Sequence, residues 1–199
     1  MPSHRRRQRA DTTSDLVILV DEQDRAIGTM PKLEAHRAGR CHRAISVIVR
    51  DRRGRLLLQQ RALGKYHSGG LWTNACCSHP RPGESVADAA ARRLVEEMGI
   101  AAAVEPLFST CYRDRVSQRL IEHEFVHVFG GVTDQTPDPN ADEVADWRWQ
   151  SLDEVVSDIE TRPQLYTVWF RMFLQRFEDD LARFVAGHAR SSSGAFFSR

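Results

Sequence analysis

The segment ESVADAAARRLVEEMGI, residues 84–100, is the stretch of sequence that decides the fold. Ala87, Ala91, Leu94 and Met98 recur at helical spacing, so they predict an amphipathic helix with one apolar stripe. Gly99 supplies the stop signal, because glycine readily takes the left-handed conformation that ends a helix.

The polar side of this helix is as informative as its apolar side. Arg93 and Glu97 are one turn apart, and such a pair alone is typical of a solvated helix surface. The wider pattern, Glu84 followed after seven residues by RRLVEEMGI, resembles the Nudix box, a loop and helix that hold a magnesium diphosphate. Ser78 stands where that box has its first glycine, and Arg93 replaces the first glutamate of its helix. The resemblance therefore implies diphosphate binding, while the missing carboxylate disfavours hydrolysis.

Length and composition limit the possible classes of protein. A chain of 199 residues that is 41% hydrophobic can bury one sizeable core, which favours one domain. Its formal net charge of +1 does not call for nucleic acid or an anionic membrane as a partner. The apolar run LVILV behind the basic cluster HRRRQR is too short for a signal peptide or a membrane span. We expect a cytoplasmic protein with a disordered basic arm at 1–14, one domain at 15–188 and a flexible tail at 189–199.

Turn-rich segments between β-rich runs predict two hairpins, at 15–30 and at 44–62. Ser151 and Glu154 have the spacing of a capping box and predict a helix start. A long amphipathic helix is predicted from about Pro163, and its apolar side would carry Trp169, Phe173, Phe177, Leu181 and Phe184. Strands mixed with a few helices, without regular alternation, indicate an α+β fold with a mixed sheet flanked by helices in a single domain.

The run LIEHEFVHV, residues 120–128, reads as a strand with an unusual face. Alternation places Glu122 and Glu124 on one otherwise aliphatic face. Two buried carboxylates are costly unless they are protonated or bound to metal. An edge strand with that face in water would remove the cost, so both interpretations stay open from the sequence.

Histidines offer what these glutamates would need. His36 and His42 lie on either side of a predicted turn, and His79 follows Cys77 by two residues. Three imidazoles with two carboxylates suit a divalent transition metal such as zinc or manganese. The ligands come from three distant segments, however, and a single histidine is more often an ordinary surface or core residue.

Cysteines and lysines single out further positions. Cys76 and Cys77 are adjacent, so a disulfide between them would be strained, and reduced thiols are expected. Of the 28 Lys and Arg residues only Lys32 and Lys65 are lysines, which suggests that these two positions need an ammonium group, unless they survive by chance.

The segment RALGKYHSGGLWTNACCSHP, residues 61–80, completes a wider resemblance. Together with the degenerate Nudix helix, a tyrosine ten residues before EHE and a tryptophan in the last helix, it resembles type 1 isopentenyl-diphosphate Δ-isomerase from about Asp15 to Arg183. By this resemblance Cys77 and Glu124 are the catalytic pair on opposite sides of an isoprenoid diphosphate, and Cys76 falls on a variable position.

The same resemblance implies the remaining roles. Tyr112 would assist proton transfer, and Trp169 would stabilise a carbocation through its π face, with Trp72 as the rival candidate. The implied ligands of the transition metal are His36, His42, His79, Glu122 and Glu124, that of magnesium is Glu97, and those of the diphosphate are Lys32, Arg61, Lys65 and Arg93.

The implied reaction converts isopentenyl diphosphate into dimethylallyl diphosphate through a tertiary carbocation, with Glu124 favoured as the acid and Cys77 as the base. It would use magnesium with the substrate diphosphate and one manganese or zinc ion. The expected partner is this small molecule, without nucleic acid or membrane, and the protein would be a monomer or weak dimer. Two alternatives remain: a Nudix hydrolase of a nucleoside diphosphate derivative, and a zinc-stabilised binding module.

Two departures from the family pattern bear on the site. His36 and His42 are one residue closer together than in the bacterial members, which implies a shorter turn between these ligands. Ser78 replaces a glycine beside Cys77, so its backbone would be strained if that position required a positive φ.

Overall fold

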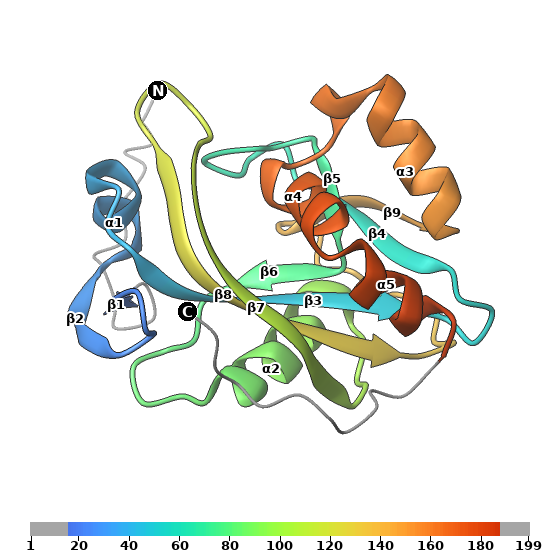
Figure 1. Ribbon diagram of the computed structural model, residues 1–199, viewed down its shortest axis with the longest axis horizontal. Coiled ribbons are helices and arrows are strands. Elements are labelled where there is room, and N and C mark those ends of the chain that lie inside the picture. The colour runs from blue at the N-terminus through green and yellow to red at the C-terminus, as the bar shows by residue number, and fades with distance from the viewer. Residues whose placement is uncertain (1–15, 188–199) are drawn as a thin grey trace, which may run out of the picture.

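The computed structural model describes residues 16–187 of the chain, which form a twisted mixed sheet with helices on both faces (Figure 1). The predicted arm at 1–14 and tail at 189–199 lie outside the described residues. Within 16–187, no helix is long and apolar enough to cross a membrane.

Both predicted hairpins are present. Strand β1 (Leu16–Val20) pairs antiparallel with β2 (Ala26–Pro31), and β3 (His42–Arg50) pairs antiparallel with β4 (Leu56–Arg61). The carboxylate of Asp51 shapes the turn of the second hairpin, because it accepts hydrogen bonds from the backbone N–H groups of Arg53 and Arg55.

The centre of the sheet joins segments that are far apart in the sequence. Strand β3 runs parallel to β8 (Ile121–Val132), which pairs antiparallel with β7 (Val104–Arg115) on its other side. The short strand β6 (Cys76–Ser78) also pairs with β3, while β4 pairs with β5 (Trp72–Asn74) and β9 (Val144–Gln150). The predicted α+β class with a mixed sheet is therefore confirmed.

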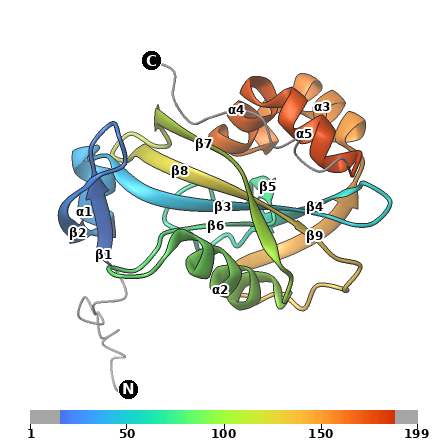
Figure 2. The ribbon, with the colours of Figure 1, turned by 60° about the horizontal axis from the view of Figure 1, so that its bottom comes forward.

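The helices cover the sheet unequally (Figure 2). Helix α2 (Val86–Met98) packs on one face, and α3 (Leu152–Thr161), α4 (Val168–Arg176) and α5 (Glu178–Val185) pack on the other. Helix α1 (Lys32–Ala38) lies at the end of the sheet that carries β1 and β2. Each face thus has its own apolar core, and the sheet separates the two.

The buried side of α2 differs from the predicted stripe. Leu94 and Met98 are buried as expected, but Ala87 is exposed and Ala91 only half-buried. The buried face instead includes the carboxylate of Glu97. Alanine has a weak hydrophobic preference, so a run of alanines does not fix which side of a helix faces the core.

The prediction of one long C-terminal helix was wrong, because this part of the chain forms separate helical segments. A 3-10 turn at Pro163–Leu165 precedes α4, and Phe177 has the non-helical angles φ −125° and ψ 33° between α4 and α5. The Phe177 ring stacks on that of Phe108 in β7, with centroids 3.9 Å apart. The helix start at Ser151, with its capping box to Glu154, is confirmed.

Candidate active site

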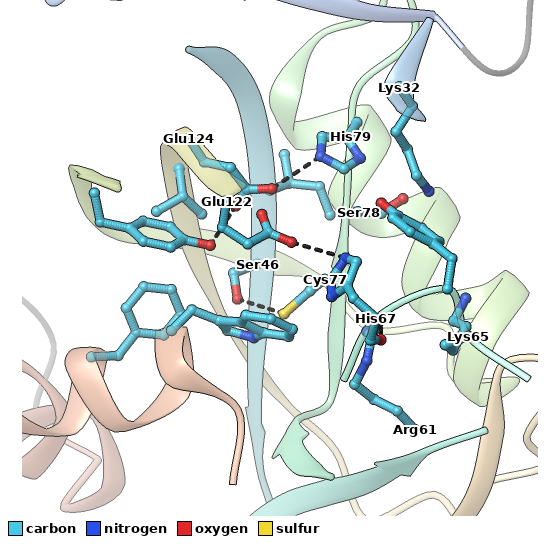
Figure 3. Close-up of a pocket in the computed structure, with 16 residues that line it drawn as sticks. Lys32, Ser46, Arg61, Lys65, His67, Cys77, Ser78, His79, Glu122 and Glu124 are labelled. Carbon is cyan, nitrogen blue, oxygen red and sulfur yellow. Dashed lines mark hydrogen bonds and ion pairs between the residues drawn. The ribbon is translucent and has the colours of Figure 1, made fainter. Parts of the chain in front are cut away.

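A pocket opens over the central strands (Figure 3). It is bounded by the loop before β5, by the first residue of α1 and by helix α4. It brings together most of the residues that the sequence singled out. Its polar lining consists of Lys32, Ser46, Arg61, Lys65, Tyr66, His67, Cys77, Ser78, His79, Tyr112, Glu122 and Glu124, and its apolar lining of Ile45, Val126, Trp169 and Phe173.

The two adjacent cysteines lie in β6, and the alternation of side chains along this strand directs them to opposite faces of the sheet. The side chain of Cys76 is fully buried in the core beneath α2, whereas Cys77 faces the pocket. The Cys77 thiol donates to Asn74 Oδ1 at 3.3 Å and lies 3.2 Å from Ser46 Oγ. Burial raises the pKa of Cys77 to about 12, although these two hydrogen bonds act in the opposite direction. Cys77 is therefore a protonated thiol at neutral pH.

Strand β8 is internal to the sheet, so the interpretation of a wet edge strand was wrong. Glu122 and Glu124 are only 3% and 9% exposed, and both point into the pocket. The Tyr112 hydroxyl donates to Glu124 Oε2 at 2.8 Å across the β7–β8 pair. Burial favours the neutral acid, but the contacts of Glu124 with His42, then with Glu122 and Tyr112, hold its pKa at about 2. Glu124 is thus an anion in this site.

The three predicted histidines converge on these glutamates. His79 Nε2 is 3.0 Å from Glu124 Oε1, and His42 Nε2 is 3.6 Å from the same oxygen. His36 Nε2 is 3.4 Å from Glu122 Oε1. The shorter turn between His36 and His42 does not keep them apart, since their ring centroids are 4.8 Å from each other.

The chemistry of this set fits a divalent cation. His36 and His42 engage backbone carbonyls through Nδ1, which directs the Nε2 lone pairs inward. Two such nitrogens, of His42 and His79, are 3.1 Å apart, and burial lowers the pKa of His79 well below its usual value. Glu122 Oε2 is buried without a hydrogen-bond partner. An unpartnered buried carboxylate oxygen is costly, and a metal ion shared by these imidazole nitrogens and carboxylate oxygens would satisfy it.

Three of the four predicted diphosphate ligands line the pocket, namely Lys32, Arg61 and Lys65. Burial and the neighbouring charge of Lys65 lower the pKa of Lys32. Arg93 and Glu97 are not in the lining but lie behind it, joined to each other at 2.7 Å. The cationic side chains therefore form two layers: Lys32, Arg61 and Lys65 line the pocket, and Arg93 lies outside this lining.

The two candidate tryptophans, Trp169 and Trp72, differ in their position relative to the pocket. Trp169 lines the pocket, and its Nε1 donates to Thr73 Oγ1 at 2.9 Å. Thr73 Oγ1 in turn donates to Asn74 Oδ1, which also accepts from Cys77. Trp72 is not in the lining, and the guanidinium of Arg148 covers its ring at 4.0 Å. Of the two, Trp169 is the one that lines the pocket, and the Arg61 guanidinium lies 5.3 Å from the centroid of its ring.

Ser78 causes no backbone strain. It is part of β6 and pairs with Ile45 of β3, and it is not among the described residues with a positive φ. The non-glycine residue with a positive φ in this region is Ser68, at 51°, in the loop before β5. Serine is therefore compatible with the backbone beside Cys77.

Comparison with known proteins identifies the family. The NUDIX domain profile matches residues 40–171. An isopentenyl-diphosphate Delta-isomerase 2 of Aromatoleum aromaticum is 53% identical over 162 residues, covering 81% of this chain and 86% of the relative. The chain belongs to the isopentenyl-diphosphate Delta-isomerase family. A second member, from Pectobacterium atrosepticum, is 49% identical over 174 residues and covers 87% of this chain and 97% of the relative.

Solved structures confirm the Nudix fold of this isomerase family member. A Deinococcus radiodurans protein aligns with a TM-score of 0.62 and 21% identity, covering 73% of this chain and 89% of its own. A MutT protein of Methanosarcina mazei gives 0.59 and 20%, covering 70% and 94%. Lys32 and His36 precede the matched NUDIX range, so α1 adds a pocket-lining lysine and a histidine against Glu122 from outside that domain profile.

Two ionisable residues of the site, His67 and Glu143, are not among the residues predicted from the sequence. His67 Nε2 is 2.9 Å from Glu122 Oε1, which places it against the proposed metal ligands. Glu143 forms ion pairs with Lys65 and, at 3.3 Å, with Arg93, and so links the two layers of cations. His67 lies inside the segment quoted for the resemblance, but nothing in its spacing marks it. Glu143 reaches the site only through the pairing of β9 with β4.

Proposed function

We propose that the protein isomerises isopentenyl diphosphate to dimethylallyl diphosphate, the reaction that the names of its relatives describe. The observation that carries this proposal is the placement of Cys77 and Glu124 in one pocket, between a cationic end and an aromatic wall. An isopentenyl group needs a proton added at one carbon and another removed, and the pocket offers a thiol and a carboxylate for this exchange.

The cationic end would hold the diphosphate. Lys32, Arg61 and Lys65 reach the pocket directly, and the two ammonium groups are the only lysines of the chain. Charge-assisted contacts of this kind keep the diphosphate fixed as an anchor rather than as a leaving group. Arg93 would support this charge from the second layer through Glu143.

Magnesium would accompany the diphosphate, with Glu97 as its proposed protein ligand. In the described structure Glu97 accepts from Arg93 at 2.7 Å and from Gln59 at 3.1 Å. If magnesium replaced Arg93 at Glu97, the freed guanidinium would become available to the diphosphate oxygens.

The proposed transition-metal ligands are His36, His42, His79, Glu122 and Glu124, with zinc or manganese as the proposed ion. A bound divalent ion would fix the carboxyl group of Glu124 and bias its protonation. His67 would orient Glu122 through their 2.9 Å contact, since partners of this kind hold ligands in position. Cytoplasmic location and a monomer or weak dimer remain predictions.

The direction of proton transfer is a separate part of the proposal. The raised pKa of Cys77 and the lowered pKa of Glu124 favour a thiol and a carboxylate as the starting forms of these two groups. Glu124 can act as the acid, as the sequence analysis favours, if a proton reaches it along the hydrogen bond from Tyr112. Tyr112 would regain its proton from the Cys77 thiol, so that the site neither gains nor loses a proton, and the resulting Cys77 thiolate would accept the proton that the substrate loses.

Solvent exchange in a variant tests this direction. In Cys77→Ala, an acidic Glu124 would still protonate the terminal methylene of isopentenyl diphosphate reversibly, so deuterium from solvent should enter the recovered substrate much faster than product forms. Mass spectrometry of the recovered substrate would show this label. An unlabelled substrate would assign the protonation step to Cys77 instead.

A paired assay tests the function against its closest rival. With magnesium, the protein should form dimethylallyl diphosphate from isopentenyl diphosphate and release no phosphate from a panel of nucleoside diphosphate derivatives. Phosphate release from that panel without isomerisation would make the protein a hydrolase. Inactivity in both assays, in protein shown to contain metal, would favour a binding module.

A further inference from the structure

A second cluster of metal-ligating side chains lies on the opposite face of the same strands. It consists of Cys41, just before β3, Cys111 in β7 and His123 in β8, and their ligand atoms all lie within 4.8 Å of one another. Both cysteines are free thiols, Cys111 is exposed, and Cys41 and His123 are half-buried. The proposed function assigns no role to any of the three.

Strand alternation explains why this cluster forms behind the pocket. The register pairs His42 with Glu124 and Tyr112 with Glu124, and the side chains of His42 and Tyr112 both contact that of Glu124 on the pocket side of the sheet. The next residue on each strand points the other way. Cys41, Cys111 and His123 each adjoin one of these pocket residues in sequence, so the sheet places them together on its reverse face.

The histidine is oriented for coordination. His123 Nδ1 lies 2.9 Å from the carbonyl oxygen of Gly39 and donates to it in the tautomer that leaves Nε2 with its lone pair. Metal-binding histidines commonly carry such a backbone partner on the other nitrogen. The backbone carbonyl of Cys41 also accepts from the Val20 N–H at 3.1 Å, which fixes that cysteine to β1.

The spacing favours an ion between the sulfurs over a disulfide. Strand β8 separates β3 from β7, so the Cα atoms of the two cysteines are at least two strand spacings, about 9.6 Å, apart. A disulfide needs Cα atoms within about 7 Å. Thiolate and imidazole ligands of one tetrahedral zinc lie roughly 3.5 Å apart, which small side-chain rotations would reach from the present positions.

We propose that Cys41, Cys111 and His123 form a second metal site for a thiophilic divalent cation such as Zn²⁺. Binding releases both thiol protons to solvent, and the exposed side of Cys111 leaves the fourth position to water. The site differs from the pocket in its chemistry, because none of the proposed pocket metal ligands is a cysteine. It would tie together the three strands that carry His42, Tyr112 and Glu124.

Cobalt(II) provides a probe that separates the two sites. Thiolate ligands give Co²⁺ a charge-transfer absorption in the near ultraviolet, which histidine and carboxylate ligands do not give. The metal-free protein, kept reduced with a phosphine, is titrated with two equivalents of Co²⁺. The wild type should develop the thiolate band, and so should Cys77→Ser, in which the pocket thiol is removed.

The exposed position of Cys111 makes Cys111→Ser a variant that should fold normally. It should lose the thiolate band, and its Kd for the thiolate-bound ion should rise at least tenfold, about 1.4 kcal/mol. Zn²⁺ should also raise its melting temperature less than that of the wild type.

Three results would overturn the proposal. They are a wild type without the band, an undiminished band in Cys111→Ser, or a band that disappears in Cys77→Ser. The isomerase assay does not enter the measurement, so a failure here leaves the proposed function standing, and the reverse also holds.

Discussion

Cys76 and Cys77 show that a shift of one position along a strand determines whether a side chain lies in the core or in the pocket. They are chemically identical neighbours, yet β6 turns one into the core beneath α2 and the other into the pocket. Asn74 and Ser46 then fix the thiol of Cys77, and Thr73 connects the same network to Trp169. The reacting thiol and the aromatic wall are therefore held by one set of hydrogen bonds.

Substitution of Trp169 tests its proposed role at this scale. Trp169→Phe and Trp169→Leu both lose the hydrogen bond to Thr73, so the pair is matched for that loss. Phenylalanine keeps a π face, which is worth about 1–2 kcal/mol toward a desolvated cation, or roughly 5- to 30-fold in rate. We expect kcat/KM with isopentenyl diphosphate to be higher for the phenylalanine variant by that factor. Equal rates would mean that Trp169 only packs.

At the scale of elements, local patterns predicted strands and helix starts well but not the rotation or continuity of helices. The hairpins, the faces of β8 and the cap at Ser151 follow from short-range rules. The exposed Ala87 and the break at Phe177 do not, because packing against distant strands determines them. Glu143 was missed for the same reason, since only the β4–β9 pairing brings it to Lys65.

The turn between β3 and β4 gives a prediction with a defined sign. Burial of Asp51 favours its neutral form, but hydrogen bonds from Arg55 and Arg53 outweigh this and lower its pKa below the usual 3.8. The charged carboxylate therefore stabilises the fold above about pH 5, and this contribution is lost as pH falls through the lowered pKa.

Asp51→Asn should accordingly lower the free energy of unfolding by about 1–2 kcal/mol at pH 7. Denaturant unfolding of both proteins between pH 7 and pH 3 would measure this difference, which should shrink as pH falls below 4. Asp142→Asn, at an exposed position, is the control and should change little. A difference that stays constant with pH would rule out the charge as its origin.

At the scale of the whole molecule, the sheet brings the residues of the site together. The proposed metal ligands come from α1, β3, the segment after β6 and β8, and the parallel pairing of β3 with β8 brings His42 beside Glu124. The sequence predicted the members of this set through resemblance. Their distances depend on contacts between segments as far apart as His36 and Glu122, which no local pattern contains.

Metal content tests this assembly. Metal analysis of the purified protein should find a tightly held transition metal in the pocket, and chelation should lower the melting temperature because the three histidines and two glutamates then lie buried without a shared cation. His79→Ala should lose that pocket metal. His127→Ala, on the other face of β8 and paired with Asp24, should keep it. Equal metal content in both variants would contradict the proposed ligand set.

The central claim is that Cys77 and Glu124 exchange protons with an isoprenoid substrate in this pocket. It is tested most directly by incubating the protein with isopentenyl diphosphate and magnesium in deuterated water and examining the product by NMR. The account predicts deuterium in a methyl group of dimethylallyl diphosphate, formed by the wild type and by Cys76→Ala but at least 100-fold more slowly by Cys77→Ala. Product without deuterium, or equal losses in the two cysteine variants, would contradict it.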